Sequence, residues 1–380
     1  MIIKKIIKLY LSKIIFFTVY FCVSIFFILS KKNIKFLNYI QSEIGSATWV
    51  DGFLRRIQNY NNKECTYICI VSGNHAANHF FEELRKNQFK KYRVITIKNK
   101  ILNKFLRGIF LYENKFTTNE MTMLNYYEFS NLKKIDWLED NKVLFEEELK
   151  KKLGMKKNDW FVCFFSRDDS YDKINRPKMT SAFQIRNTDI KTFLPAMNYI
   201  TSEGGYAIRI GSTASEKLIN SNKKIIDYSF SPYQNKMNDF LLLYFCNYCV
   251  GTPSGILDLA TLNNKPLVLV NNYEYMYMQS FNKGLFIPKL LLKKDGEFLT
   301  LKNYIKKIGK TYSIDKLNNL INKYDLVYID NSPDDILQIT QEMFKILRDI
   351  NCQNKNLNFA HYDSKNGLEI FKSFSQKYKI

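Results

Sequence analysis

The sequence lacks the short motifs that mark several common enzyme classes. It contains no G-x-G-x-x-G, no G-x-x-x-x-G-K-[S/T], no H-E-x-x-H and no G-x-S-x-G. These absences argue against a dinucleotide fingerprint, a P-loop, a zinc protease and an α/β-hydrolase. No Asp-x-Asp occurs either, which weakens any diphosphate site bridged by a metal ion.

Histidine is scarce and cysteine is odd in number. Two of the three histidines, His75 and His79, follow the apolar run TYICIVSG, where a general base would fit, although a single histidine is more often structural. Most of the seven cysteines lie in apolar runs, which indicates reduced core thiols and a reducing compartment. Cys246 and Cys249 form a C-x-x-C, but no second pair or nearby histidine completes four zinc ligands. We predict no metal site.

The chain is rich in apolar residues and in positive charge. With 380 residues, 46% apolar, it predicts a folded protein of two domains. The net charge is +21, of which seven lysines lie in the first 35 residues. An acidic membrane, a nucleotide diphosphate or nucleic acid would suit this charge. A compositional bias toward Lys, Asn and Ile explains it equally well.

Residues 14–30, IIFFTVYFCVSIFFILS, form an uncharged apolar run between Lys13 and Lys31. As a helix these 17 residues would extend roughly 25 Å, which barely crosses a bilayer. No A-x-A cleavage site follows. We therefore expect residues 1–35 to be an uncleaved anchor that spans or lies on the inner membrane, with the body on its cytoplasmic face. A buried core helix is the alternative.

Strand-like and helix-like segments alternate along the body. TYICIVSG, AANHFFEELRKNQF and YRVITI predict one βαβ unit in an N-terminal domain, residues 36–150, and the charged helical stretch 131–158 predicts a boundary near 150. In a second domain, 151–350, five strands alternate with helices, which predicts a mostly parallel doubly wound sheet. Residues 351–380 form a tail whose end, LEIFKSFSQKYKI, predicts a helix that packs on the other lobe.

Three motifs fall where strands of the second domain are predicted to end. In open α/β sheets, ligands bind at the carboxyl ends of strands. Gly251, Thr252, Ser254 and Gly255 belong to G-T-P-S-G, which follows a strand and opens a helix. Small residues there would let a phosphate approach backbone amides and hydroxyls. A plain βα turn with Ser254 as N-cap explains the pattern equally well.

Two arginines also end apolar strands. Arg167 in FFSRDDSY and Arg209 before Gly211 in IRIGS would hold a diphosphate through their guanidinium groups. The alternative for Arg167 is a local ion pair with Asp168 or Asp169, and Arg209 has the same two interpretations.

Several of these segments, in order, resemble a family of bacterial glycosyltransferases of surface-polysaccharide loci, built like GT-B enzymes. FVCFFSRDDSY resembles the family's strand ending in His-Val-Arg-Asp, and IRNTDIKTFLPAMNYITSEGGYAIRIGS is similar to its Arg-Asn-Ala-Asp-Ile helix, Gly-Gly turn and Arg-Met-Gly-Asp. MNDFLLLYFCNYCVGTPSG is similar to a Met-Asp helix followed by Gly-Thr-Ser-Ser-Gly. The resemblance covers residues 160–272 closely. Upstream, SEIGSATW and AANHFFEEL resemble Ile-Gly-His and Ala-Asn-Arg segments more loosely.

The sequence departs from the family's pattern at three positions. Ser46 and Phe165 stand where the family has histidine, and Ser212 stands where it has the Asp of Arg-Met-Gly-Asp. If either histidine is the family's base, this chain needs a substitute, for which His75, Glu43 and Asp51 are candidates.

The resemblance implies two Rossmann-like lobes, of which the second binds a nucleotide sugar and the first an acceptor. It implies substrate-binding roles for five residues: Gly45, Ser46, Asn78, Arg186 and Asn187. The implied reaction transfers a sugar to a polysaccharide or lipid-linked acceptor without a metal or other cofactor, with Arg167 and the G-T-P-S-G amides stabilising the leaving diphosphate. Two alternatives stay open: a nucleotide-sugar epimerase of related fold, and a non-catalytic basic protein that binds membrane or nucleic acid. No nucleic-acid-binding motif occurs, so we expect no nucleic-acid partner.

Overall fold

The computed structural model describes residues 33–60, 65–98, 132–175, 184–273, 284–308, 314–353, 362–363, 367–368 and 372–379. The chain divides into two compact units, residues 1–137 and 138–380. The predicted boundary near residue 150 lies inside helix α7 (Lys142–Lys152), which packs on helix α11 (Lys236–Phe245) of unit 2. The division therefore precedes this helix.

Unit 1 holds a three-stranded parallel sheet in the order β1-β2-β3, with bounds Asn33–Ile40, Cys65–Ser72 and Ile95–Ile97. Helices α2 (Ala47–Tyr60) and α3 (His79–Lys91) follow the first two strands. The βαβ unit predicted from the sequence is therefore confirmed, and β1 was missed. No reversal of strand order occurs among the described strands of unit 1, so the doubly wound arrangement is confirmed for unit 2 alone.

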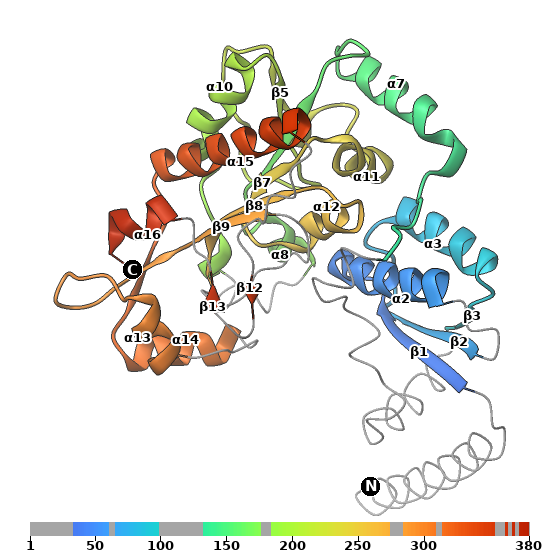
Figure 1. Cartoon of the computed structure of the whole chain (residues 1–380), viewed down its shortest axis with the longest axis horizontal. Coiled ribbons are helices and arrows are strands. Elements are labelled where there is room, and N and C mark those ends of the chain that lie inside the picture. The colour runs from blue at the N-terminus through green and yellow to red at the C-terminus, as the bar shows by residue number, and fades with distance from the viewer. Residues whose placement is uncertain are drawn as a thin grey trace, which may run out of the picture. The chain divides into compact units, whose positions relative to one another are not determined.

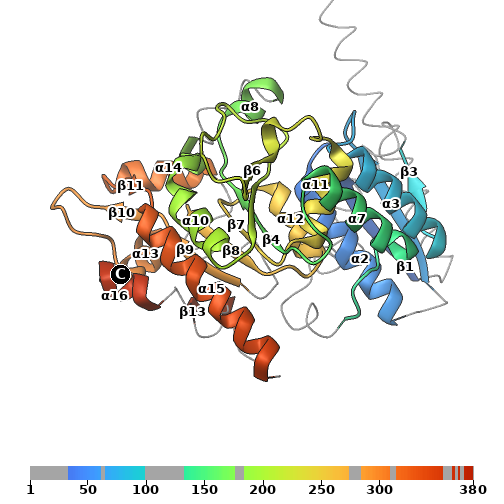
Figure 2. The ribbon, with the colours of Figure 1, turned by 90° about the horizontal axis from the view of Figure 1, so that it is seen from above.

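Unit 2 is built on a six-stranded parallel sheet in the order β6-β5-β4-β7-β8-β9 (Figures 1 and 2). The bounds in chain order are Phe161–Phe165, Tyr206–Arg209, Ile225–Asp227, Cys249–Gly251, Leu267–Asn272 and Gly284–Pro288. β7, β8 and β9 are buried along their whole length. Burial of these strands, including the edge strand β9, shows that both faces of this half of the sheet are covered.

Helices cover both faces of this sheet. α10 (Leu194–Ser202) and α15 (Pro333–Gln353) pack on each other and on the sheet, while α11 (Lys236–Phe245) packs on α12 (Asp258–Leu262) on the other face (Figure 1). Local signals in the sequence set the helix ends. Asn235 Oδ1 caps α11 by accepting from Asn238 N at 2.9 Å, and Ser332 Oγ caps α15 by accepting from Asp335 N at 3.2 Å, as predicted.

A second, smaller core in unit 2 was not predicted. It joins the antiparallel pair β10 (Leu290–Leu292) and β11 (Val327–Ile329) to helices α13 (Leu301–Lys307) and α14 (Ile314–Lys323). Its buried residues are Leu291, Leu299, Tyr304, Ile308, Leu317, Ile321 and Leu326. The chain thus leaves the main sheet after β9 and returns to it through α15.

The C-terminal segment packs on its own unit, so the prediction that it packs on the other lobe is wrong. Helix α16 (Lys372–Tyr378) places Lys377 Nζ 2.8 Å and Tyr378 Oη 2.7 Å from the buried carboxylate of Asp335 in α15. The Tyr378 ring also packs edge-on against Phe298. Polar partners for Asp335 lie in unit 2, and they fix the helix there.

The predicted anchor, residues 1–35, lies almost entirely outside the described residues. Among the helices that the structure describes, none is both long and apolar enough to cross a membrane. Residues 33–35 begin β1. The anchor therefore stays a prediction for the residues before this strand.

Candidate functional site

The strand order of unit 2 creates a switch point between β4 and β7. From β4 the chain adds β5 and β6 on one side, then returns to add β7, β8 and β9 on the other. β4 and β7 are adjacent and parallel, with Phe165 opposite Gly251. Ligands of open α/β sheets bind outside the carboxyl ends of strands at such a point. Two of the predicted motifs, Arg167 and the Gly251–Gly255 turn, follow these two strands.

Gly251 and Thr252 join the ends of β4 and β7. A Cβ atom on Gly251 would lie 2.7 Å from the Phe165 carbonyl oxygen, so a side chain does not fit. Thr252 N donates to that same oxygen at 3.1 Å. The buried Thr252 hydroxyl accepts from Arg167 N at 2.9 Å. Both residues therefore have a structural role, which leaves their predicted contact with a phosphate untested.

The turn continues into a short helical segment. Gly255–Leu257 form a 3-10 turn, and α12 follows directly. Ser254 occupies the N-cap position in an extended conformation, but its side chain makes no capping hydrogen bond. The alternative prediction that Ser254 caps a helix therefore holds for its position and not for its hydroxyl. Ser254 and Gly255 are half-buried.

Arg167 is buried and paired. Its guanidinium donates to Asp172 and to Asn187 Oδ1, and its exposed fraction is 8%. The ion pair is local, as the alternative prediction proposed, but the partner is Asp172. Asp168 and Asp169 have other partners, which are the Ser215 hydroxyl and the Lys173 ammonium. Arg167 thus brings Asn187 to the switch point, and its role toward a diphosphate stays a prediction.

Arg186 also reaches the turn. Its Nη2 donates to the Pro253 carbonyl oxygen at 2.9 Å, and its guanidinium lies 5.9 Å from the centre of the Tyr273 ring. The side chain is half-buried. Arg167, Arg186, Asn187 and the G-T-P-S-G turn, which are separated by up to 88 positions in the sequence, are therefore neighbours in the structure.

Lys289 is a cation that the sequence interpretation missed. It directly follows β9, and its side chain is 5% exposed. Nζ donates to the Asn187 carbonyl oxygen at 3.2 Å and to Asp330 Oδ1 at 2.6 Å. A lysine directly after a buried apolar strand was the available signal.

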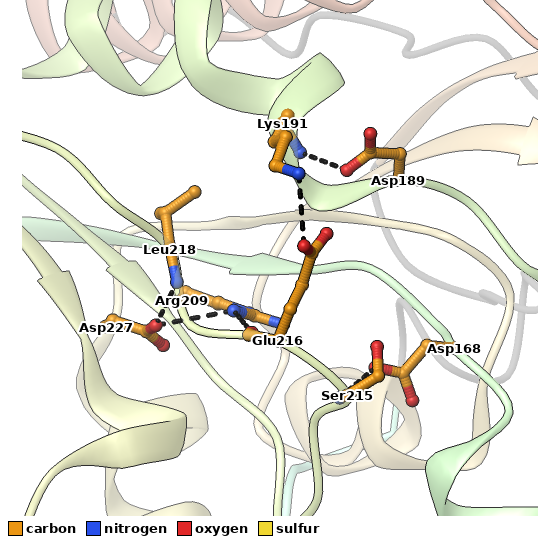
Figure 3. A network of polar contacts seen from close by, with 8 residues as sticks. All are labelled: Asp168, Asp189, Lys191, Arg209, Ser215, Glu216, Leu218 and Asp227. Atoms are coloured by element: carbon orange, nitrogen blue, oxygen red, sulfur yellow. Dashed lines mark hydrogen bonds and ion pairs between the residues drawn. The ribbon is translucent and has the colours of Figure 1, made fainter.

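Arg209 and Gly211 shape the loop of residues 211–218. Figure 3 shows Arg209 beside Glu216, Leu218 and Asp227. Arg209 Nη1 donates to the Glu216 carbonyl oxygen at 2.7 Å and lies 3.3 Å from Asp227 Oδ2, which also accepts from Leu218 N. Gly211 has a φ of +146°, which favours glycine. The local ion pair predicted for Arg209 is therefore present, and both residues support the 211–218 loop.

A cavity of about 330 Å³ opens under this loop. Residues at or just after the ends of β4, β5 and β11 line it together with the segment 187–190: Ser166, Asp168, Asn187, Thr188, Asp189, Ile190, Arg209, Ser215, Glu216 and Asp330. Asp168 Oδ2 accepts from both the amide and the hydroxyl of Ser215, at 2.7 and 2.9 Å. Burial acts to raise the pKa of Asp168, but hydrogen bonds from Ser170 and Ser215 outweigh it and lower the pKa below its ordinary value. Asp168 is therefore a carboxylate at neutral pH.

In unit 1, two predicted base candidates lie at one edge of the sheet. Glu43 follows β1 and His75 follows β2, and both are exposed. Gln41 links their loops, since its amide donates to Ser72 O at 2.9 Å and its side chain to Gly73 O at 2.7 Å. The carboxyl edge of this sheet thus presents an acid and a histidine from neighbouring strands, whose catalytic role stays a prediction.

Other predicted residues of unit 1 are used by the fold itself. Asn78 Oδ1 caps α3 by accepting from Phe81 N at 2.9 Å. Ser46 is 1% exposed, and the Gly45 carbonyl oxygen accepts from the Thr48 hydroxyl at 3.0 Å. Their substrate-binding roles stay predictions.

Asp51, the third candidate base, is 2% exposed and accepts from Arg55 at 2.7 Å and from Trp137 at 3.3 Å. These contacts give it a structural role, and its role as a base stays a prediction.

Three buried cysteines form a cluster in unit 2. The Sγ atoms of Cys163, Cys246 and Cys249 lie within 4.8 Å of one another, and no further His, Cys, Asp or Glu of the described residues joins them. The Cys163 thiol donates to the Leu242 carbonyl oxygen at 3.6 Å. The C-x-x-C pair was visible in the sequence, whereas the third thiol comes from the strand paired with it.

Comparisons with known proteins place the chain near glycosyltransferase structures at low similarity. No protein-family model and no curated protein matches the sequence. A glycosyl transferase family 9 structure from Veillonella parvula is 8% identical, with a TM-score of 0.44 over 83% of this chain and 98% of that one. The E. coli ADP-heptose LPS heptosyltransferase II is 11% identical, with a TM-score of 0.37 over 77% and 99%. The wall teichoic acid polymerase TagF is 12% identical, with a TM-score of 0.28 over 76% and 70%. These likenesses establish no family for the chain.

Proposed function

We propose that the protein is a glycosyltransferase that moves a sugar from a nucleotide-sugar donor to a surface-polysaccharide or lipid-linked acceptor. One observation carries the proposal. Arg167, Arg186, Asn187 and the Gly251–Gly255 turn meet outside the carboxyl ends of β4 and β7, at the switch point of the sheet. This is the position at which doubly wound sheets bind nucleotides.

The charges at this point suit a diphosphate. Asp172 balances the charge of Arg167, so Arg186 supplies the further positive charge beside the turn. An arginine can bind phosphate oxygens through two parallel N–H groups. We assign Arg186 to the donor diphosphate, and we assign Arg167 the positioning of Asn187 and of the turn.

During transfer the bond between the donor sugar's anomeric carbon and the diphosphate oxygen breaks, and a bond to the acceptor hydroxyl oxygen forms. Negative charge grows on the departing diphosphate, and the Arg186 guanidinium with the amides of the turn would stabilise it. The acceptor hydroxyl loses a proton to a base. For this base we propose His75 or Glu43 of unit 1, which also binds the acceptor.

The sequence contains no Asp-x-Asp, and we propose that the reaction needs no metal ion. The basic composition and the apolar residues 14–30 suit a membrane-bound acceptor at the cytoplasmic face of the inner membrane. These assignments of acceptor and location depend on the residues before β1.

Calorimetric titration of the full chain with UDP-, GDP-, CMP-, ADP- and dTDP-sugars tests the proposal. We expect one nucleotide class to bind, and Arg186→Ala to weaken its binding at least tenfold. Lys173→Ala is the matched control, because Lys173 pairs with Asp169 on the surface in the same unit. Binding of no nucleotide sugar by a folded chain would overturn the proposal.

Arg167 needs a different variant. Arg167→Ala would leave Asp172 buried without its counter-charge, which typically costs about 3–5 kcal/mol, so the loss of binding would be ambiguous. In the double variant Arg167→Met with Asp172→Leu, both charges are removed together. If this double variant folds and still binds the donor, the Arg167 guanidinium is not a ligand that the diphosphate requires, which agrees with our assignment of that role to Arg186.

A further inference from the structure

The cavity under the 211–218 loop has a chemistry that differs from that of the switch point beside it. Four carboxyl groups line it, those of Asp168, Asp189, Glu216 and Asp330, against the one guanidinium of Arg209. Asp227 pairs with that guanidinium. The lining therefore offers many hydrogen-bond acceptors and would repel a phosphate.

Cations near the cavity reduce its negative charge without removing its acceptors. Lys191 Nζ lies 3.0 Å from Glu216 Oε2, and Lys289 Nζ lies 2.6 Å from Asp330 Oδ1 (Figure 3 shows the first pair). Each pair occupies one carboxylate oxygen, and a carboxylate accepts about four hydrogen bonds through its two oxygens. Capacity remains for a ligand that donates hydrogen bonds.

Thr188 gives an independent indication of a ligand. It lines the cavity and is 8% exposed, and its hydroxyl has no hydrogen-bond partner. An unsatisfied buried hydroxyl costs stability, which a bound polar group recovers. The hydroxyl can accept as well as donate, whereas the carboxylates around it can only accept.

We propose that this cavity, lined by Asp168, Thr188, Asp189 and Glu216, binds a sugar ring through neighbouring hydroxyl groups. A sugar ring presents several O–H donors on a compact frame, which is what an acceptor-rich wall binds. The volume of about 330 Å³ lies at the low end of the range for small-molecule sites, roughly 300–1,000 Å³. This volume suits one ring of a nucleotide sugar.

This inference rests on the proposed function and names the part of the donor that the cavity takes. Ser166 and Asp168 line the cavity on either side of Arg167, and Asn187 belongs to both the cavity and the switch point. A diphosphate at the switch point would thus place a ring of the donor in the cavity. Two rings have this chemistry, the nucleoside ribose and the transferred sugar.

Calorimetric titration of the full chain tests the inference with two variants. Thr188→Val removes the hydroxyl and keeps the shape, and Glu216→Gln changes a half-exposed carboxylate that tolerates substitution in the fold. We expect each to weaken binding of the nucleotide sugar about tenfold. Asp295→Asn, an exposed carboxyl in the β10–α13 connection, is the matched control and should bind like the wild type.

Analogues identify which ring is bound. If the ribose lies in the cavity, the 2′-deoxynucleoside diphosphate binds the wild type more weakly than the nucleoside diphosphate does, and Thr188→Val and Glu216→Gln remove this difference. If the transferred sugar lies there, the variants weaken the nucleotide sugar and leave the nucleoside diphosphate unchanged.

The remaining outcomes separate the two proposals. Wild-type binding that Arg186→Ala weakens, but that both cavity variants leave unchanged, overturns the sugar pocket and leaves the glycosyltransferase standing. The sugar pocket is also overturned if the cavity variants weaken the nucleotide sugar, the nucleoside diphosphate and the 2′-deoxynucleoside diphosphate by the same factor. A folded wild type that binds no nucleotide sugar overturns both.

Discussion

At the scale of single residues, Gly251 shows how a packing requirement and a candidate site coincide. Because Gly251 has no side chain, β7 packs so close to β4 that a Cβ atom at this position would lie 2.7 Å from the Phe165 carbonyl oxygen. The same approach allows Thr252 to accept from the Arg167 amide. The glycine therefore sets the position of two site residues through packing alone.

We predict that Gly251→Ala lowers both stability and donor binding. Forcing an atom into a packed contact costs about 1–3 kcal/mol, and the shift of β7 would move the turn away from Arg186. Thermal unfolding and nucleotide-sugar titration measure the two effects. Gly296→Ala is the contrast, because nothing lies within 4 Å of its Cβ position and its φ is +82°. It should lose stability through backbone strain and keep full binding, and equal binding losses in both would contradict this account.

Asp51 predicts a pH dependence for unit 1. Burial raises its pKa to about 6 from an ordinary value of 3.8, although the Arg55 ion pair and the Trp137 hydrogen bond act to lower it. Between these values the folded state keeps a proton that the unfolded state has released. The contribution of Asp51 to the free energy of unfolding is therefore largest below pH 3.8. It falls by about 1.4 kcal/mol per pH unit as the pH rises toward 6.

Asp51→Asn should remove this slope. Denaturant unfolding followed by hydrogen exchange of α2 amides, at several pH values between 4 and 7, measures it. Glu83→Gln, an exposed carboxyl on α3, is the control and should keep the wild-type slope. An unchanged slope in Asp51→Asn would show that other groups cause the dependence.

At the scale of elements, α16 is held to α15 by one buried carboxylate. Asp335 accepts from the Ser332 amide and hydroxyl, from Lys377 and from Tyr378. Tyr378→Phe keeps the ring against Phe298 and removes one donor to a charged group, which typically costs about 1.5–3 kcal/mol. We predict a matching loss of stability and faster hydrogen exchange in α16. Gln376→Ala, an exposed change on the same helix, should do neither, and similar behaviour of both variants would exclude this role for Asp335.

The sequence predicted those strands and caps whose pattern lies within a single element. Apolar runs bounded by turn residues located β2, β4, β5, β7 and β8. The N-cap at Ser332 was predicted from the serine and the proline that follows it. β1 was missed because NIKFLNYI mixes polar and apolar residues directly after lysines.

Features that depend on how one element packs against another could not be predicted. The small core of unit 2 draws its members from β10, α13, α14 and their connections. The apolar residues of α14 do follow a helical repeat, but the repeat does not show which segments they pack against. Pairing of Arg167 with Asp172 depends on how α8 (Ser170–Asn175) turns back after β4. The cavity needs the order of β5, β4 and β7 in the sheet, which strand sequences do not encode locally. The motifs at strand ends were visible, but their neighbours were not.

At the scale of the whole molecule, the two units divide the proposed work. Arg167, Arg186, the G-T-P-S-G turn and the sugar pocket all belong to residues 138–380, which hold their own sheet and cores. The candidate bases Glu43 and His75 belong to residues 1–137. Donor binding and proton abstraction are thus assigned to separate units.

We predict that residues 138–380, expressed alone, fold cooperatively and bind the nucleotide sugar within about threefold of the full chain's affinity, yet transfer no sugar. A domain of this size can bury a core of its own, and every group that we assign to the donor lies within it. Thermal unfolding, titration and a transfer assay measure the three properties, with Arg186→Ala in the same fragment as the control for specific binding. If the fragment folds but binds the nucleotide sugar tenfold more weakly than the full chain, part of the donor site lies in unit 1. Loss of unit 1 is the one difference between the fragment and the full chain.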